Sequence, residues 1–161
     1  MLTTRKVLMA ALAGAALMIA SPALAATTIH VDMGDTGASG PMPTGLGHGM
    51  GGDMSKATMF IKLDRKSVPA GEVTFEAKNS SKNLVHEMIV APLNSADEIL
   101  PYDGSETEVN EEKAGYIGEV EEVDPGKTGT ATLDLKPGEY ILYCNLPGHY
   151  MAGMWTILTV E

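Results

Sequence analysis

The sequence predicts an all-β domain built as a sandwich of two sheets, with about seven to eight strands. From residue 58 onward, short stretches of alternating apolar and polar residues are separated by Gly, Pro, Asn and Asp, which is the pattern of half-buried strands joined by turns. The length of 161 residues suits one ordinary domain. Aromatic residues make up only 5% of the chain and there are 11 methionines, so we expect a core of aliphatic and Met side chains.

The first 25 residues have the order of a secretory signal peptide. Arg5 and Lys6 precede an apolar run over residues 7–20, and the small-residue motif Ala23-Leu24-Ala25 follows. A membrane anchor is the alternative, but the apolar run is short for a span of about 20 residues. We expect cleavage after Ala25, export to the oxidising periplasm, and no membrane span in the mature chain.

The mature chain is strongly acidic. The full sequence has 11 basic and 21 acidic residues and a net charge of −10, and loss of Arg5 and Lys6 with the leader makes the charge −12. This balance argues against nucleic acid or an anionic membrane as a partner. A basic or neutral partner fits better.

Residues 26–56 are predicted to form a flexible arm ahead of the folded domain over 57–161. Eight glycines fall within positions 34–52, and such a segment buries too little apolar surface to offset its ordering entropy. The arm also contains thioether and imidazole groups, which suit Cu(I): His30, Met33, Met42, His48, Met50 and Met54. They form either an accessory copper site or an incidental part of a Gly-rich linker.

Within the domain, the first half contains three predicted strands. One covers residues 59–63, and a turn at 68–71 leads to a strand whose alternation places three apolar side chains on its buried face: Val73, Phe75 and Ala77. The next strand covers 84–91 and ends at Pro92. In this strand His86 shares a face with Leu84, Met88 and Val90.

The second half contains a predicted hairpin and a last strand. Residues 129–135 and 139–144 pair across a turn at Pro137-Gly138. This hairpin places Cys144 on the same inward face as Tyr140 and Leu142. The last strand covers residues 155–160.

The connection between the two halves, residues 97–124, is predicted to be a solvated loop. It contains eleven acidic residues and one lysine, without sustained apolar periodicity. A short helix around 107–114 fits the local propensity, although propensity alone is weak support. A dedicated docking patch is the alternative to a solvated charge run.

The single cysteine, Cys144, decides the functional interpretation. In an exported chain, a lone cysteine is a free thiol, an intermolecular bridge or a metal ligand. His149 and Met154 follow it with four residues between each pair, and His86 points inward from an earlier strand. Two imidazoles, a thiolate and a weak axial thioether form a copper site that cycles between Cu(I) and Cu(II). The sequence therefore predicts a copper site.

Other assignments fit these residues less well. An inward histidine such as His86 is ordinarily a hydrogen-bonded core residue, but its companions favour a ligand. Met151 is off the regular spacing, and we expect it to cover the site rather than bind the metal. A binuclear copper centre needs two bridging thiolates, and Met154 disfavours zinc.

These motifs resemble the cupredoxin (type 1 blue copper, plastocyanin/azurin-like) family over about residues 57–161. The spacing of the Cys144 loop is most similar to that of rusticyanin-like and auracyanin-like members. The resemblance implies a Greek-key β-sandwich, one type 1 copper ion per chain and one-electron transfer between larger redox proteins. It implies four metal ligands: His86, Cys144, His149 and Met154. It also implies the Val85 carbonyl as a weak fifth ligand.

The sequence departs from the family pattern beside the first ligand. Many relatives have Asn directly after the first His, whereas here Glu87 follows His86 and Asn145 follows Cys144. Groups around the ligands tune a metal site and hold its ligands. We therefore predict a hydrogen bond between Glu87 and Asn145.

The functional prediction is an electron carrier rather than an enzyme. No Ser-His-Asp set, phosphate-binding Gly motif or open metal position is evident in the sequence. We expect electron exchange near His149 and a transient redox partner, such as a basic cytochrome, steered by the acidic connection. We also expect a monomer. The alternative is a copper-binding protein for storage, delivery or tolerance, with the arm capturing Cu(I).

Overall fold

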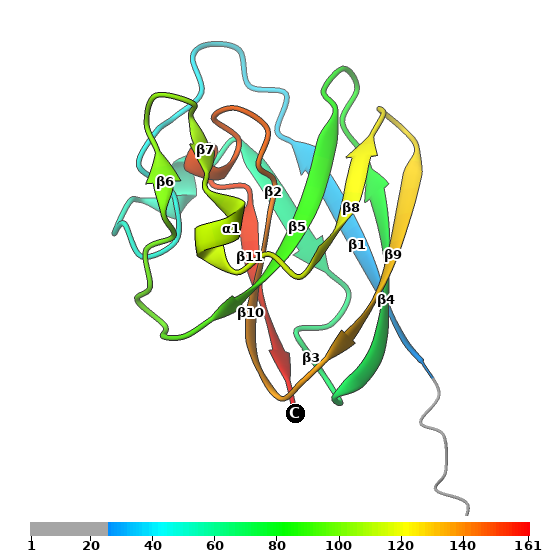
Figure 1. The fold of residues 1–161 in the computed structure, drawn as a ribbon. Coiled ribbons are helices and arrows are strands. Elements are labelled where there is room, and N and C mark those ends of the chain that lie inside the picture. The colour runs from blue at the N-terminus through cyan, green and yellow to red at the C-terminus, as the bar shows by residue number, and fades with distance from the viewer. Residues whose placement is uncertain (1–25) are drawn as a thin grey trace, which may run out of the picture.

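Two β-sheets packed face to face form a Greek-key sandwich in the computed structural model, which describes residues 26–161 (Figure 1). The predicted signal peptide lies outside the described residues. In spatial order the first sheet contains β2 (Met59–Leu63), β1 (Thr27–Asp35), β4 (Gly71–Asn79) and β9 (Thr128–Leu135). The second contains β3 (Ser67–Val68), β11 (Trp155–Val160), β10 (Gly138–Tyr143), β5 (His86–Leu93) and β8 (Gly118–Val123). The predicted all-β fold class is confirmed.

Short elements cover the outer face of the second sheet. They are the ribbon of β6 (Tyr102–Asp103) and β7 (Glu108–Val109), and the helix α1 (Glu111–Ala114). Asn110 caps α1 by accepting a hydrogen bond from the Lys113 N–H at 3.0 Å. The predicted short helix therefore forms. Two 3-10 turns complete the described elements: η1 (Met54–Lys56) and η2 (Tyr150–Ala152).

The predicted flexible arm over residues 26–56 is wrong for its first part. β1 lies inside the first sheet, antiparallel to β2 and parallel to β4. Ile29, Val31 and Met33 are buried, and they alternate with outward residues in the ordinary strand pattern. The glycine-rich composition that suggested an arm begins only at Gly34. The domain therefore begins at β1 and not at residue 57.

The predicted loop over residues 97–124 is also wrong at its end. β8 pairs antiparallel with β5 and forms an edge of the second sheet. It buries Val120 and Val123. Glu121 and Glu122 between them are exposed, and Glu119 before them is half-buried. A register shift between His86 and Met88 interrupts the pairing, which explains why a strict alternation is missing from the sequence.

The core has two parts, one between the sheets and one outside the second sheet. The inner part contains Val73, Phe75 and Ala77, as the alternation predicts, together with Met88 and Leu142. The outer part contains aromatic and aliphatic side chains under the β6–β7 ribbon: Ile89, Val109, Ile141, Tyr143 and Tyr150. β5 and β10 are consequently covered on both faces. Among the described residues, no helix has the length and apolar character needed to cross a membrane.

β1 can be tested as part of the core. Because Ile29 is completely buried, Ile29→Ala should lower the free energy of unfolding by about 2–5 kcal/mol. Its neighbour His30 is exposed and pairs with Glu76 at 3.1 Å, so His30→Ala should change stability by less than about 1 kcal/mol. Urea unfolding measures both. Equal, small effects would contradict a structural role for β1.

Candidate metal centre

Three buried side chains meet at one end of the sandwich: His86, Cys144 and His149. Their donor atoms all lie within 4.8 Å of one another. The His149 Nδ1 atom is 3.3 Å from the Cys144 Sγ atom and 3.3 Å from the His86 Nδ1 atom. The sequence-predicted imidazoles and thiol are therefore brought together.

Antiparallel pairing of β5 with β10 creates this meeting point. Tyr143 is opposite Ile89 in the ladder, so the first residue of β5 and the residue after β10 lie at the same edge. His86 begins β5, and Cys144 directly follows β10. Residues 58 positions apart in the chain thus become neighbours through the sheet register.

The loop after Cys144 folds back on itself to deliver His149. The His149 N–H donates to the Leu146 carbonyl at 2.9 Å, and the Met154 N–H donates to the His149 carbonyl at 3.1 Å. Gly148 and Gly153 have φ angles of 81° and 94°, a backbone conformation that favours glycine. These two glycines let the loop turn tightly around the histidine.

Met154 lies at the base of the same loop. Its carbonyl accepts a hydrogen bond from the Cys144 N–H at 3.1 Å, and its side chain is completely buried in the inner core with Cys144. Met151 packs instead with the outer core. Axial ligation by Met154 and a contact from the Val85 carbonyl stay predictions.

Burial keeps all three donors uncharged in the metal-free chain. It lowers the pKa of His86 to about 4, with the neighbouring His149 adding to the effect, and it also lowers the pKa of His149. Burial raises the pKa of Cys144 to about 12. Neutral imidazoles have a free lone pair for a metal, and binding of a cation displaces the thiol proton.

The donor set fits copper. Imidazole nitrogen, thiolate and thioether together suit a copper ion in its two oxidation states. Cys144 is the free thiol of the described residues, and it faces an imidazole. The burial of His86, Cys144 and His149 keeps their donors away from competing water ligands.

The predicted hydrogen bond between Glu87 and Asn145 is confirmed. The Asn145 N–H donates to the Glu87 Oε1 atom at 3.0 Å. Burial raises the pKa of Glu87 to about 7, with nearby glutamates adding to the effect and this bond opposing it. The carboxyl group of Glu87 thus anchors the residue directly after Cys144.

The Asn145 side chain ties the loop to the outer ribbon. Its Oδ1 atom accepts from the Val109 N–H at 2.7 Å, and its Nδ2 atom donates to the Val109 carbonyl at 3.0 Å and to the Glu111 Oε1 atom at 2.9 Å. These three hydrogen bonds have ordinary N–H···O distances. The loop is therefore fixed from the side of β7 and α1.

A second support comes from residues 36–58, which the sequence interpretation missed. The Leu46 N–H donates to the Met151 carbonyl at 3.0 Å, and the Trp155 Nε1–H donates to the Leu46 carbonyl at 2.7 Å. Gly47 lies so close to the Tyr150 ring that a Cβ there would be 2.7 Å from it. Leu46 and Trp155 were the sequence features that could have indicated this packing, because they are apolar residues in or beside glycine-rich loops.

The histidines of the predicted accessory Cu(I) site do not converge. His30 pairs with Glu76 on the outer face of the first sheet. The His48 Nδ1 atom is 2.7 Å from the Glu98 carbonyl oxygen, and its ring lies edge-on to Trp155. Met33 is completely buried in the core. The accessory-site interpretation is therefore not supported.

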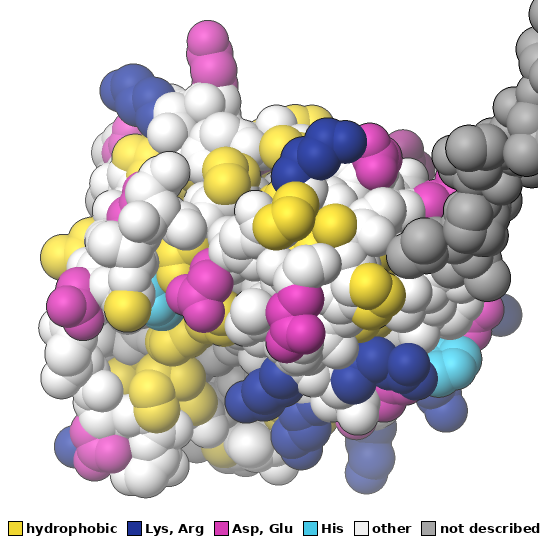
Figure 2. Space-filling model, turned by 90° about the horizontal axis from the view of Figure 1, so that it is seen from below, with side chains coloured by type: hydrophobic (Ala, Val, Ile, Leu, Met, Phe, Trp, Pro, Cys, Tyr) yellow, Lys and Arg dark blue, Asp and Glu magenta, His cyan; other side chains and the backbone are white. Residues whose placement is uncertain are grey.

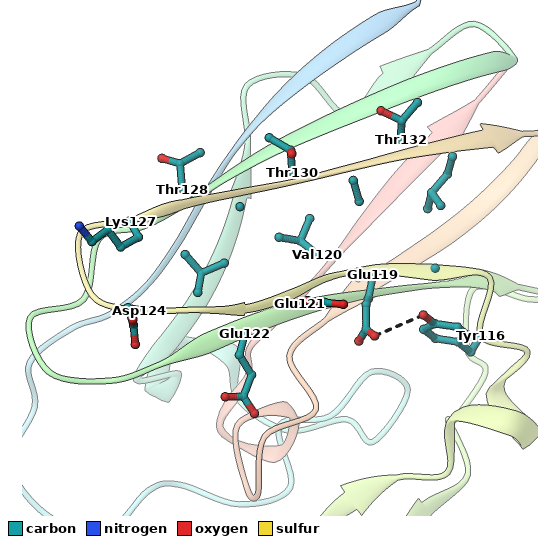
Figure 3. A pocket seen from close by; sticks show the side chains of 15 residues that line it. Tyr116, Glu119, Val120, Glu121, Glu122, Asp124, Lys127, Thr128, Thr130 and Thr132 are labelled. Carbon is teal, nitrogen blue, oxygen red and sulfur yellow. Dashed lines mark hydrogen bonds between the residues drawn. The ribbon is translucent and has the colours of Figure 1, made fainter.

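A large hollow lies away from this centre, between the edge strands β8 and β9 (Figure 3). It has a volume of about 750 Å³ and is lined by threonines of β9 and glutamates of β8. Tyr116 donates a hydrogen bond to Glu119 at its margin, at 3.3 Å. Because β8 and β9 are edge strands of different sheets, the hollow is the open seam between the two sheets. Its lining includes none of the three metal-site residues.

Comparison with known proteins assigns the family. Residues 50–161 match the family model for copper binding proteins of the plastocyanin/azurin family. Auracyanin B is similar in fold, with 21% identity and a TM-score of 0.53 over 88% of this chain and 93% of that chain. Rusticyanin from Thiobacillus ferrooxidans has 18% identity and a TM-score of 0.50 over 85% of this chain and 79% of that chain.

None of the curated proteins compared with the chain matches it. The family match covers more than half of the chain and includes all three residues of the buried His-Cys-His cluster. The chain therefore belongs to the plastocyanin/azurin family of copper-binding proteins, and its cluster is the centre for one type 1 copper ion.

Proposed function

We propose that the protein is a one-electron carrier that exchanges electrons near His149. The observation that carries this proposal is the closed, buried donor set: His86, Cys144 and His149 face one another. With Met154 as the proposed fourth ligand, such a centre would leave no open position where a substrate could bind, unlike a catalytic metal site. We therefore propose a carrier and not an enzyme.

The bound copper supplies a one-electron couple between Cu(I) and Cu(II). The chain contributes an environment that changes little between the two states. His149 is held by backbone hydrogen bonds within its loop, and Asn145 fixes the loop to the outer ribbon. Burial of the donors excludes water. Preorganised ligands reduce the reorganisation that accompanies electron transfer.

The route to the surface leads through His149. His149 lines a cavity of about 300 Å³ together with Asp35, Thr58 and residues 38–41. Three larger apolar side chains complete the lining: Met42, Met59 and Leu84. Met42 and Leu84 are exposed. A small apolar surface at the metal end suits a weak, transient redox complex.

We further propose a basic redox partner, such as a cytochrome. Glu87, Glu119, Glu121 and Glu122 line a shallow hollow on β5 and β8, and Glu87 contacts the loop that carries the ligands. At the other end of the sandwich, Lys and Arg side chains lie beside Asp and Glu (Figure 2). Negative charge near the site would steer a basic partner toward it.

We propose that the carrier is a periplasmic monomer. The supporting observations are the signal-peptide pattern of residues 1–25 and the acidic charge of the mature chain. Copper storage or delivery is not favoured as the alternative, because His30 and His48 have other partners.

The ligand assignment predicts a change in the visible absorption spectrum and a change in the reduction potential, measured by voltammetry. Cys144→Ala should abolish the intense visible charge-transfer band of the copper-loaded protein, because the thiolate is its source. Met154→Leu should retain copper and raise the reduction potential. The axial thioether donates to Cu(II), so its removal leaves the oxidised state less stable relative to Cu(I). Met151→Leu is the matched control in the same loop and should change neither. A lower potential in Met154→Leu would contradict the axial assignment.

The proposed electron route predicts an effect on self-exchange between Cu(I) and Cu(II) molecules. Met42→Glu should slow self-exchange at low salt by at least about tenfold, because two such surfaces would bring like charges together. Ile117→Glu is the matched control, since Ile117 is comparably exposed and directly precedes β8, whose first residue pairs with Val90 while its last residue pairs with His86. NMR line broadening measures the rate. Equal slowing in both variants would contradict the route.

A further inference from the structure

We propose that residues 36–58, which we call the strap, gate the passage of copper into and out of the metal centre. Opening of the strap exposes the cavity beside His149, and an anchor formed by residues 46–48 sets how often the strap opens. The strap supplies no ligand, so it controls the rates of copper binding and release without changing the affinity. This inference concerns loading of the copper centre and goes beyond the proposed electron transfer.

Among the three donor residues, His149 lies nearest to solvent. His86 and Cys144 are completely buried, whereas 8% of His149 is exposed. The cavity that His149 lines has a volume of about 300 Å³. It has room for an ion with several small ligands, since one water molecule occupies about 30 Å³ in the liquid. Copper therefore reaches the donors most directly through this cavity.

The strap forms the outer wall of the cavity. It runs from β1 across the end of the sandwich that carries the metal loop, residues 144–154, and returns to β2 (Figure 1). Residues 38–42 line the cavity and are themselves exposed, so one layer of chain separates the cavity from solvent. Met42 rests on the metal loop, because a Cβ at Gly148 would be 2.9 Å from its Cε atom.

Three consecutive residues anchor the strap: Leu46, Gly47 and His48. They are buried, while every other residue of segment 36–56 is partly or fully exposed. The Leu46 N–H donates to the Met151 carbonyl at 3.0 Å, and the Leu46 carbonyl accepts from the Trp155 Nε1–H at 2.7 Å. The anchor is thus bonded to both ends of the short turn that follows His149.

His48 ties the anchor to a second loop. Its Nδ1 atom is 2.7 Å from the Glu98 carbonyl oxygen. A carbonyl only accepts, so this nitrogen carries the proton and donates it. The His48 ring also lies edge-on to the Trp155 indole, with centroids 4.8 Å apart. Glu98 is itself held, because its carboxylate accepts from the Asn94 N–H at 2.6 Å. The anchor therefore has a fixed point outside the metal loop.

Glycines on either side of the anchor allow the strap to move. Gly37 and Gly51 have φ angles of 69° and 72°, and nothing lies within 4 Å of the Cβ position of either. Glycine backbones adopt many conformations, and the open space lets them change without a clash. Between these glycines, Leu46 and His48 make the hydrogen bonds from the strap to the rest of the described chain. Few contacts therefore oppose a local opening that leaves the sandwich folded.

The anchor is tested by His48→Leu in the mature chain. Leucine is apolar and has no donor for the Glu98 carbonyl, so the population of open strap should rise by about fivefold, the scale of one lost hydrogen bond. Uptake of Cu(II) by the copper-free chain and loss of Cu(II) to saturating EDTA should accelerate by the same factor. The visible charge-transfer band follows both. The affinity, which is the ratio of the two rate constants, should be unchanged.

His30→Leu is the matched control, because His30 is exposed and pairs with Glu76 on the outer face of the first sheet. It should change neither rate. Unchanged rates in His48→Leu would overturn the gate. So would faster loss with unchanged uptake, which is the signature of a weakened ligand set.

Gly47→Ala tests the anchor without removing a hydrogen-bonding group. A Cβ at Gly47 would be 2.7 Å from the Tyr150 ring, so alanine pushes the anchor away from the metal loop. Both copper rates should rise again, with the affinity unchanged. Wild-type rates in Gly47→Ala would show that the packing of the anchor does not control access, and would refute the proposal.

Amide hydrogen exchange in the copper-free chain reports the strap without any metal. The Leu46 N–H should exchange faster in His48→Leu and Gly47→Ala than in the wild type, because its bond to the metal loop breaks when the strap opens. The Cys144 N–H, which donates to the Met154 carbonyl at 3.1 Å, should keep its protection. Equal protection of Leu46 in all three proteins, or joint loss of protection at Leu46 and Cys144, would contradict a separate gate. None of these measurements uses electron transfer, so slow electron exchange would contradict only the proposed function.

Discussion

The metal centre depends on one backbone constraint, the antiparallel pairing of β5 with β10. This pairing places the start of one strand beside the end of the other, and so His86 beside Cys144. Both strands are covered on two faces, by the inner core and by the outer aromatic cluster. Movement of either strand along the other would disturb both cores at once, because a register slip of one residue reverses every side chain. The position of the centre is thereby coupled to the stability of the fold.

Around this edge, three separate segments hold the ligands. Asn145 joins the Cys144 loop to β7 and α1, and Leu46 and Trp155 join it to residues 36–58. Ser81 holds the far side of His86. The supports approach from different directions, so together they restrict rotation as well as translation of the donors. Burial sets the protonation states of the donors, because it keeps both imidazoles neutral and the thiol protonated until a cation binds.

The surface divides the remaining tasks between apolar contact and charge. Met42 and Leu84 border the cavity at His149, where close approach of a partner matters. The glutamates of β8 lie to one side, near Glu87, where charge can orient a partner without entering the path. In the proposed carrier, this separation allows fast association and also fast release, because the apolar contact is small.

Local patterns in the sequence were sufficient for the strands around the site and for the three residues that meet there. The alternation of Val73, Phe75 and Ala77 and the spacing from Cys144 to Met154 depend only on strand periodicity and ligand chemistry. The departure from the family pattern beside His86 predicted the bond between Glu87 and Asn145. β1 and β8 were decided only by the tertiary structure. Composition hid β1, which pairs with the distant strand β4, behind a glycine-rich neighbour. A register shift interrupted the pairing of β8 with β5. Such pairing is a property of the sheet as a whole, and no local stretch of residues encodes it.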